Sequence, residues 1–156
     1  MRVIVAGSKT VCDDALVREA IDASGFHISE IVSGGAKGVD ESGERIAIAA
    51  GIPLRRFPAD WGRYGKKAGG IRNREMAVYA DALIAVWDGK SRGTRLMIEL
   101  MRKAQKPFYI HGPYMRNLTP SEIESLRQGI EDAYRQLQDR FYLDEKGKLR
   151  IRPKVE

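Results

Sequence analysis

Three short apolar runs in this chain are each followed by a glycine-bearing loop. The runs with their loops are residues 3–6 with 7–9, 28–32 with 33–40, and 82–87 with 88–94. A strand that leads through a glycine-rich turn into a helix directs backbone N–H groups and the positive end of the helix dipole toward one point, which favours an anion. In an open α/β sheet such loops leave the carboxyl ends of the strands, where ligands bind. Together the three loops predict one phosphate-binding site.

Short apolar runs bounded by turn residues predict five strands, over residues 2–6, 28–32, 54–57, 82–87 and 107–110. The stretches between them have helical spacing. They predict a first helix capped by Asp13 or Asp14, and further helices over residues 39–50, 71–79 and 94–104. Alternating strands and helices favour a parallel sheet with helices on both faces. We therefore expect an α/β fold, a Rossmann-like three-layer sandwich with a mostly parallel five-stranded sheet.

Composition limits the class of protein further. Of the 156 residues 43% are hydrophobic, which suits a globular domain with a buried core. The formal net charge of +6 favours phosphorylated or polyanionic partners. Cys12 is the single cysteine, so a disulfide framework is excluded and a reducing compartment fits. The first residues enter a strand at once and no apolar run approaches the ~20 residues of a membrane span, so we expect a soluble cytoplasmic protein without a membrane partner.

The C-terminal tail has a pattern of its own. Residues 119–122 are typical of a helix start, and apolar residues then recur at three- and four-residue intervals as far as Leu137. Residues 141–151 resemble a hairpin around a Lys-Gly pair. We therefore divide the chain into a Rossmann-like ligand-binding domain, residues 1–110, and an extension, residues 111–156. The extension is expected to pack on the domain or at the interface of a homo-oligomer.

A strongly basic segment covers residues 55–74, with seven Arg or Lys side chains and one acid, Asp60. Trp61 and Tyr64 are interleaved with the basic residues. Aromatic side chains offer stacking faces for a base, while Arg and Lys hold phosphate. We expect a long loop from residue 58 to residue 74 that closes over a ligand. The alternative is a solvated basic face with Trp61 packed against the core.

Polar residues next to these loops are candidates for chemistry. Arg72 and Asn73 are expected at a helix start, where a guanidinium can clamp a phosphate and an amide can orient a sugar hydroxyl. Glu75 can be an acid or base, although an ion pair with a neighbouring arginine explains it more simply. Asp40 is a helix cap or a contact to a ribose or metal, and Asp88, which follows a strand, points into the crevice.

The catalytic residue is undetermined, with Arg72, Glu75 and Asp88 as candidates. The residues predicted to bind ligand lie on the three loops or the basic segment: Gly7, Ser8, Lys9, Ser33, Gly34, Gly35, Lys37, Gly38, Asp40, Asp60, Trp61, Tyr64, Arg72, Asn73, Asp88, Lys90, Ser91, Arg92, Gly93 and Thr94.

Several familiar sites are disfavoured. The third loop lacks the Walker A spacing and the first is not a dinucleotide fingerprint, which argues against ATP hydrolysis and NAD binding. His27 and His111 have no carboxylate or cysteine companions at ligand spacing, so no metal site is expected. No cofactor is required, although Mg²⁺ can accompany phosphates at Asp88 or Asp40. No Ser-His-Asp set can be assembled.

Five segments of the chain, in order, resemble the SLOG superfamily, and most closely its YspA-type, YpsA-related SLOG domain. They are residues 7–9, 33–40, 57–61, 65–76 and 87–94. The resemblance covers residues 1–110. It implies a Rossmann-like fold that binds nucleotides or nucleotide-derived ligands, as a sensor or in nucleotide metabolism.

Two branches of that superfamily imply alternatives. Cytokinin-activating phosphoribohydrolases cleave a nucleoside monophosphate with an arginine and a Pro-Gly-Gly-x-Gly-Thr-x-x-Glu motif. Arg72 and Thr94 match that pattern in kind, but Met97 stands where the glutamate is required. The nearest acid, Glu99, lies two residues later, about 200° around a helix. Proteins of the DprA type carry a Ser-Gly-x-Ala-x-Gly-Ile-Asp motif similar to residues 33–40, and in them the pocket contributes to single-stranded DNA binding.

We therefore expect a module that binds a nucleotide-type small molecule as a sensor, a sequestering module or a nucleotide-processing protein. The first alternative is a single-stranded DNA-binding protein of the DprA type. The second is a nucleoside monophosphate N-glycosidase. Whether the protein is an enzyme stays open at this point.

Overall fold

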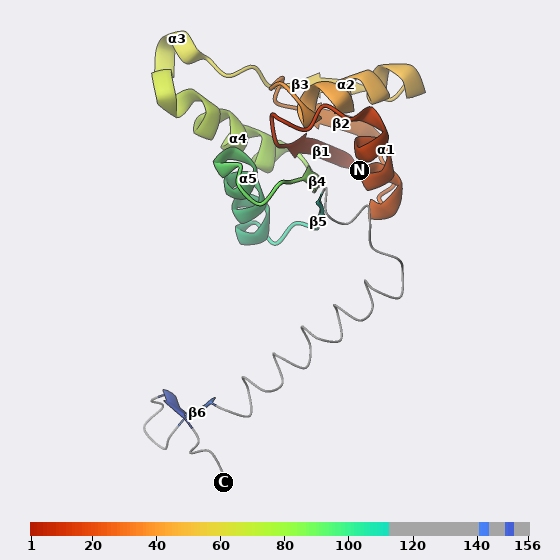
Figure 1. Ribbon diagram of the computed structural model, residues 1–156. Helices are drawn as coiled ribbons and strands as arrows, with labels where there is room; N and C mark the ends of the chain where they lie inside the picture. The colour runs from red at the N-terminus through yellow and green to blue at the C-terminus, as the bar shows by residue number, and fades with distance from the viewer. Residues whose placement is uncertain (113–140, 144–148, 152–156) are drawn as a thin grey trace. The chain divides into compact units, whose positions relative to one another are not determined.

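The computed structural model describes residues 1–112, 141–143 and 149–151 (Figure 1). Contacts within the chain divide it into two compact units, Met1–Met115 and Arg116–Glu156. The first unit holds all five predicted strands and the three glycine-bearing loops.

A single five-stranded sheet forms the centre of the first unit. Its strands are β1 (Arg2–Gly7), β2 (Glu30–Ser33), β3 (Leu54–Arg56), β4 (Ala82–Val86) and β5 (Phe108–His111). Their order across the sheet is β3-β2-β1-β4-β5, and every neighbouring pair is parallel. The predicted α/β Rossmann-like fold is therefore confirmed, with a sheet that is parallel throughout. Because the strands run the same way, the three predicted loops leave the same edge.

The helices that connect these strands are α1 (Asp14–Ser24), α2 (Val39–Ala50), α3 (Trp61–Tyr64), α4 (Ala68–Tyr79) and α5 (Arg92–Lys103), with a 3-10 turn, η1 (Gly65–Lys67), between α3 and α4. Asp13 caps α1, since its side chain accepts a hydrogen bond from the backbone N–H of Leu16 at 3.1 Å. Gly51 ends α2 in the left-handed conformation, as a C-terminal glycine commonly does.

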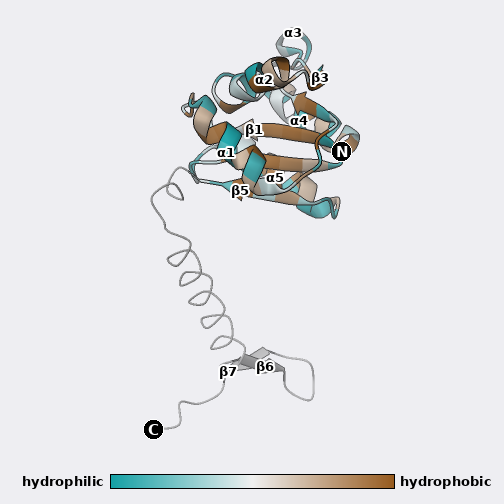
Figure 2. Ribbon diagram, turned by 90° about the vertical axis from the view of Figure 1, so that its right-hand side faces the viewer, coloured by the Kyte–Doolittle hydropathy of each residue, from teal (hydrophilic) through white to brown (hydrophobic). Residues whose placement is uncertain are grey.

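Alternate residues of the strands build two separate cores. Val3 and Val5 of β1 pack with α1 and α2 on one face of the sheet. Ile4 and Ala6 pack with α4 and α5 on the other. Figure 2 shows the apolar strands enclosed between these helices. Since side chains of a strand alternate between faces, one apolar run supplies both cores of a three-layer sandwich.

The basic segment differs from the predicted long loop. Most of it is helical, because α3, η1 and the first turns of α4 lie within residues 58–74. Asp60 starts α3 by accepting a hydrogen bond from the backbone N–H of Arg63 at 2.9 Å. Every residue from 61 to 67 is exposed, so no buried face marks these turns in the sequence. Trp61 is 59% exposed rather than packed against the core.

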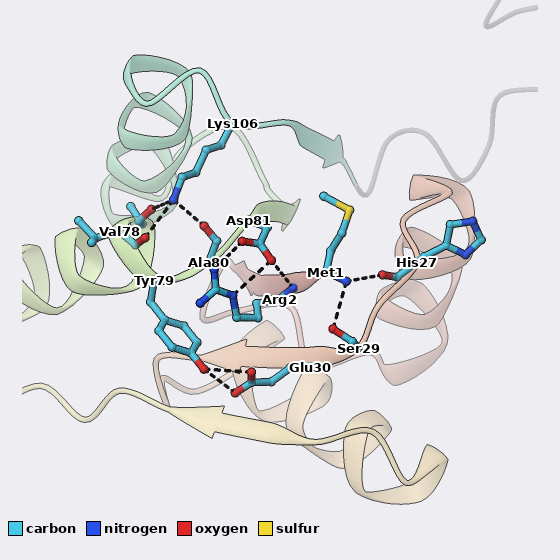
Figure 3. Close-up of polar contacts among 11 residues, drawn as sticks. Met1, Arg2, His27, Ser29, Glu30, Val78, Tyr79, Ala80, Asp81 and Lys106 are labelled. Atoms are coloured by element: carbon cyan, nitrogen blue, oxygen red, sulfur yellow. Dashed lines mark hydrogen bonds and ion pairs between the residues drawn. The ribbon is translucent and has the colours of Figure 1, made fainter.

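The amino edge of the sheet, opposite the loops, is closed by charged side chains (Figure 3). Lys106 donates from Nζ to the carbonyl oxygens of Ala77, Val78 and Ala80, at 2.8, 3.0 and 2.6 Å, and so caps the carboxyl end of α4. Arg2 pairs with Asp81 at 2.7 Å between Nη2 and Oδ1. These contacts secure the connection from α4 into β4, away from the predicted site.

The second unit contains β6 (Phe141–Leu143) and β7 (Leu149–Ile151), which pair antiparallel with Tyr142 opposite Arg150. This pairing agrees with the predicted hairpin. The connecting residues 144–148 and the predicted helix that starts at residues 119–122 lie outside the described residues. The proposed role of the extension in packing or oligomerisation stays a prediction.

Candidate functional site

The carboxyl edge of the sheet carries a cleft of about 1050 Å³. The loops after β1, β2 and β4 form its floor. The starts of α4 and α5, the two helices that pack on one face of the sheet, line its side. The predicted site residues that line it are Gly7, Lys9, Gly34, Gly35, Lys37, Asp40, Trp61, Arg72, Asn73, Asp88, Lys90, Ser91, Gly93 and Thr94. The fold thus brings three loops from distant parts of the sequence to one concave surface.

Other predicted residues lie outside the lining of the cleft. They are Ser8, Ser33, Gly38, Asp60, Tyr64, Glu75 and Arg92. Ser8 and Ser33 are buried beneath the loops, and Asp60 caps α3. The Arg63 guanidinium lies over the ring of Tyr64, 5.1 Å from its centroid. Glu75 is exposed on α4. These residues therefore support the loops or face solvent.

Asp40 organises the loop after β2 from below. Its Oδ2 accepts hydrogen bonds from the backbone N–H groups of Gly34, at 3.1 Å, and Ala36, at 3.4 Å. The side chain makes no cap of its own helix, because Gly38 is the N-cap of α2 and no side chain bonds there. Asp40 is thus a loop-forming residue that also lines the cleft.

Burial raises the pKa of Asp40 from 3.8 to about 6. The positive charge of Arg72 and the N–H groups of Ala36, Gly34 and Gly7 act in the opposite direction. The carboxylate therefore titrates close to neutral pH, within the lining of the cleft. A carboxyl group perturbed in this way inside a cleft is a candidate functional group.

Arg72 reaches across from α4 to the same loop. Its Nη1 donates to the carbonyl oxygen of Gly34, and its Nε donates to Oδ1 of Asn73 at 3.0 Å. A Cβ atom on Gly34 would overlap the Arg72 guanidinium, so only glycine allows this close approach. Arg72 was expected at a helix start, yet α4 begins at Ala68 and places it in the second turn. The loop, rather than the helix terminus, therefore fixes this guanidinium.

The loop after β1 packs tightly against the other two. Ser8 is 1% exposed, and its Oγ accepts a hydrogen bond from the backbone N–H of Asp88 at 3.1 Å. Gly38 has a φ of +84° and lies against the carbonyl oxygens of Ser8 and Lys9, where a Cβ atom would collide. These contacts lock the three loops into one surface.

The loop after β4 is shaped by its own polar side chains. Oδ1 of Asp88 accepts hydrogen bonds from the backbone N–H groups of Lys90 and Ser91, both at 2.9 Å, which lower the pKa of Asp88. Ser91 caps α5 by accepting from the N–H of Thr94 at 3.4 Å. Asn73 donates from Nδ2 to the carbonyl oxygen of Gly93 at 3.2 Å and so joins α4 to α5. Asp88 lines the cleft, and its Oδ1 is engaged by the backbone of the turn.

Three lysines on the cleft have no acidic partner among the described residues. Lys9, Lys37 and Lys90 are exposed at its lining, and none of them forms an ion pair within the residues that the structure describes. Arg72 likewise bonds to neutral acceptors. The floor of the cleft is therefore positively charged, with only Asp40 and Asp88 as acids in its lining.

Comparison with known proteins shows the family to which the chain belongs. Its residues 1–64 match the family described as YspA, cpYpsA-related SLOG family. The gene 61 protein of Mycobacterium phage D29 is 37% identical over 115 residues, which cover 67% of this chain and 89% of the phage protein. The chain belongs to the YspA, cpYpsA-related SLOG family.

Among solved structures, this SLOG protein is similar to DNA processing protein A (DprA) from Streptococcus pneumoniae, with a TM-score of 0.57 and 17% identity. The likeness covers 82% of this chain and 56% of the DprA chain. At this identity it shows the fold alone.

The cleft of the SLOG protein is also lined by residues that were not predicted from the sequence. They are Ala6, Thr10, Ala36, Arg56, Pro58, Ala59, Gly69, Gly70, Met76, Leu96 and Met97. Gly69 and Gly70 could have been singled out from the sequence, because two adjacent glycines at a helix start weaken the helix. Arg56 ends an edge strand, so its approach to the cleft depends on strand order, which residue spacing does not fix.

Neither metal nor membrane features are present in the parts of the SLOG protein that the structure describes. No group of three or more His, Cys, Asp or Glu side chains there could hold a metal ion. None of the helices within residues 1–112 is long and apolar enough to cross a membrane.

Proposed function

We propose that this SLOG protein binds a nucleotide or a nucleotide-derived ligand in the cleft at the carboxyl edge of its sheet. The observation that carries the proposal is the convergence of three glycine-bearing loops with Lys9, Lys37 and Lys90, which lack acidic partners among the described residues. Positive side chains and helix N-termini at such loops favour phosphate. The volume of about 1050 Å³ is at the upper end of typical small-ligand clefts.

A second, apolar end of the cleft supports a nucleotide over a simple phosphate. Pro58, Ala59, Trp61 and Leu96 line it together with the glycines at the start of α4. Trp61 is 59% exposed, and its ring makes no aromatic or cation–π contact among the described residues. A free indole beside a cationic floor suits a base that stacks while its phosphate is held.

Binding is favoured over hydrolysis of the N-glycosidic bond. The lining contains Asp40 and Asp88, whereas Glu75 and Glu99 are exposed elsewhere on the surface. Oδ2 of Asp40 and Oδ1 of Asp88 each accept two backbone N–H groups. We therefore assign the protein a binding role. Cleavage of a bound nucleoside monophosphate is one outcome that the thermal-shift experiment distinguishes.

A DNA-processing role is the second candidate. The DprA-like fold supports it, as do the exposed cations Arg63, Lys66 and Lys67 beside the cleft. Binding along a phosphate backbone depends on oligonucleotide length and falls steeply with salt, whereas binding of one nucleotide in a cleft does not grow with length.

A thermal-shift screen tests the two candidates together. The purified protein is heated with nucleoside phosphates, cyclic and linked dinucleotides, ADP-ribose and oligonucleotides of increasing length, with and without Mg²⁺. A ligand at 100 times its Kd stabilises the folded state by about 2.7 kcal/mol. We expect small nucleotides to raise the Tm. Stabilisation by oligonucleotides alone would favour DNA processing, and release of free base from a stabilising monophosphate would show turnover.

A further inference from the structure

Arg56 is a guanidinium at the rim of the cleft that no part of the site described above employs. It ends β3 and lines the cleft, with 58% of its side chain exposed. Glu44 holds one edge of the guanidinium: its Oε2 accepts from Nε of Arg56 at 2.9 Å and lies 2.7 Å from Nη2. The Nη1 donors have no partner among the described residues. The side chain is thus fixed along one edge and open along the other.

Glu44 contacts Ser33 as well as Arg56. Its side chain on α2 is 12% exposed, and its Oε1 accepts a hydrogen bond from the hydroxyl group of Ser33 at 2.6 Å. The Oγ of Ser33 in turn accepts the backbone N–H of Gly35 at 3.0 Å. One chain of hydrogen bonds therefore connects the floor of the cleft, through Ser33 and Glu44, to Arg56. Such support holds a guanidinium in one orientation before a ligand arrives.

Strand order places Arg56 far from the opposite flank of the floor. Along the sheet the order β3-β2-β1-β4 puts three strand spacings between Arg56 and the loop after β4. At about 4.8 Å for each spacing, this separation is roughly 14 Å. This is a separation between backbones, and Glu44 holds the Arg56 side chain at its own flank. We therefore expect a ligand that engages both flanks to carry acceptors at separated positions.

We propose that Arg56, positioned by Glu44, binds a second anionic group of the ligand, so that the cleft prefers nucleotides with two separated phosphates. This inference rests on the proposed nucleotide-binding function. Glu44 acts as a positioning residue, and Arg56 is the residue that contacts the ligand. Guanidinium suits the task because it presents several donors in a fixed plane to phosphate oxygens.

Calorimetric titration with three probes tests the inference: AMP, ADP and adenosine 3′,5′-bisphosphate. ADP carries adjacent phosphates, so it separates the effect of spacing from that of total charge. The wild-type protein should bind the bisphosphate about tenfold more tightly than AMP or ADP, as expected for one additional charge-assisted contact. Arg56→Ala should remove this preference and leave AMP binding unchanged, whereas Glu44→Gln should weaken the preference.

Arg55→Ala is the matched control. Arg55 is the neighbouring residue of β3, it does not line the cleft, and its guanidinium lies 5.7 Å from the ring centroid of Phe57. Its removal changes the net charge equally but should keep the preference for the bisphosphate. The inference is overturned if Arg56→Ala weakens all three probes equally, or if it weakens none. If the wild-type protein binds none of the three probes and none of the nucleotides in the thermal-shift screen, the proposed function itself fails, and this outcome is recognised without any variant.

Discussion

The backbone N–H of Gly34 donates to the buried carboxylate of Asp40 at 3.1 Å. Asp40 belongs to α2 and is 4% exposed, while Gly34 lies in the loop that forms the floor of the cleft. Glycine suits the arrangement, because a Cβ atom there would also approach Oδ2 of Asp40 to 2.9 Å and displace this side chain or that of Arg72. A titratable group thus sits directly beneath the surface proposed to hold phosphate.

Asp40 should make the stability of the protein fall as pH rises from about 4 to 6. Its pKa is raised to about 6 by burial, so in this range the folded state binds a proton that the unfolded state, with a pKa of 3.8, has lost. A shift of two pKa units corresponds to about 3 kcal/mol. Urea unfolding at pH 4.5, 5.5 and 6.5 should show this decline in the wild type and a flatter profile in Asp40→Asn.

The carboxylates with lowered pKa values are present in both the wild type and Asp40→Asn, so their contributions cancel in the comparison. Asp14 and Asp81 have pKa values lowered to about 2 by their arginine partners, so their stabilising contributions are lost only as the pH falls below about 4. Equal slopes in the wild type and Asp40→Asn between pH 4.5 and 6.5 would contradict the assignment.

Lys106→Met should destabilise the protein by about 1–3 kcal/mol, because the ammonium group donates to three carbonyl oxygens at the end of α4. Affinity for nucleotides should not change, since this cap lies at the edge of the sheet opposite the cleft. The free energy of unfolding in urea measures the effect. Lys103→Met, on an exposed position in the last turn of α5, is the control and should cost less, at most about 1 kcal/mol. Similar stability of the two variants would show that the cap contributes little.

Gly70→Ala should raise stability and weaken nucleotide binding. The residue is helical, and a Cβ atom would meet Cδ2 of Leu96 at an ordinary 3.8 Å, so neither backbone conformation nor packing requires glycine. Alanine at a helical position is favoured over glycine by roughly 0.5–1 kcal/mol. The added methyl group would occupy the apolar end of the cleft, where we place the base.

Tm and the Kd for nucleotide, measured on the same preparations, test whether Gly70→Ala raises stability while it weakens binding. Gly62→Ala on α3 is the control: Gly62 lies outside the cleft lining, and its Cβ atom would be 3.6 Å from Oδ1 of Asp60. It should leave the Kd unchanged. An unaltered Kd in Gly70→Ala would place the base elsewhere.

The elements that could be predicted from sequence are those with a buried face and clear ends. The helix over residues 39–50 was predicted with the bounds that the structure has, because its Ala/Ile stripe is buried and Gly51 ends it. The five apolar runs likewise became the strands, within a few residues at each end. Loops that follow such strands were placed correctly at one edge, since parallel strands share a direction.

The features that escaped prediction depend on exposed or long-range structure. Residues 61–67 are helical but all lie on the exposed surface, so no apolar periodicity in the sequence marks them. The start of α4 at Ala68 was missed because Gly69 and Gly70 are poor helix formers. The series of hydrogen bonds from Ser33 through Glu44 to Arg56 connects β2, α2 and β3. Residue spacing in the sequence does not predict it.

The most direct test of nucleotide binding compares two charge-matched substitutions in calorimetric titrations with the nucleotide that gives the largest thermal shift. Lys9 and Lys37 line the cleft and make no ion pair among the described residues, so the double variant Lys9→Ala/Lys37→Ala should fold normally. It should bind at least tenfold more weakly, about 1.4 kcal/mol or more. The double variant Lys103→Ala/Arg18→Ala removes equal charge from exposed positions outside the lining and should bind as the wild type does. Equal affinity of both double variants for the nucleotide would contradict the account.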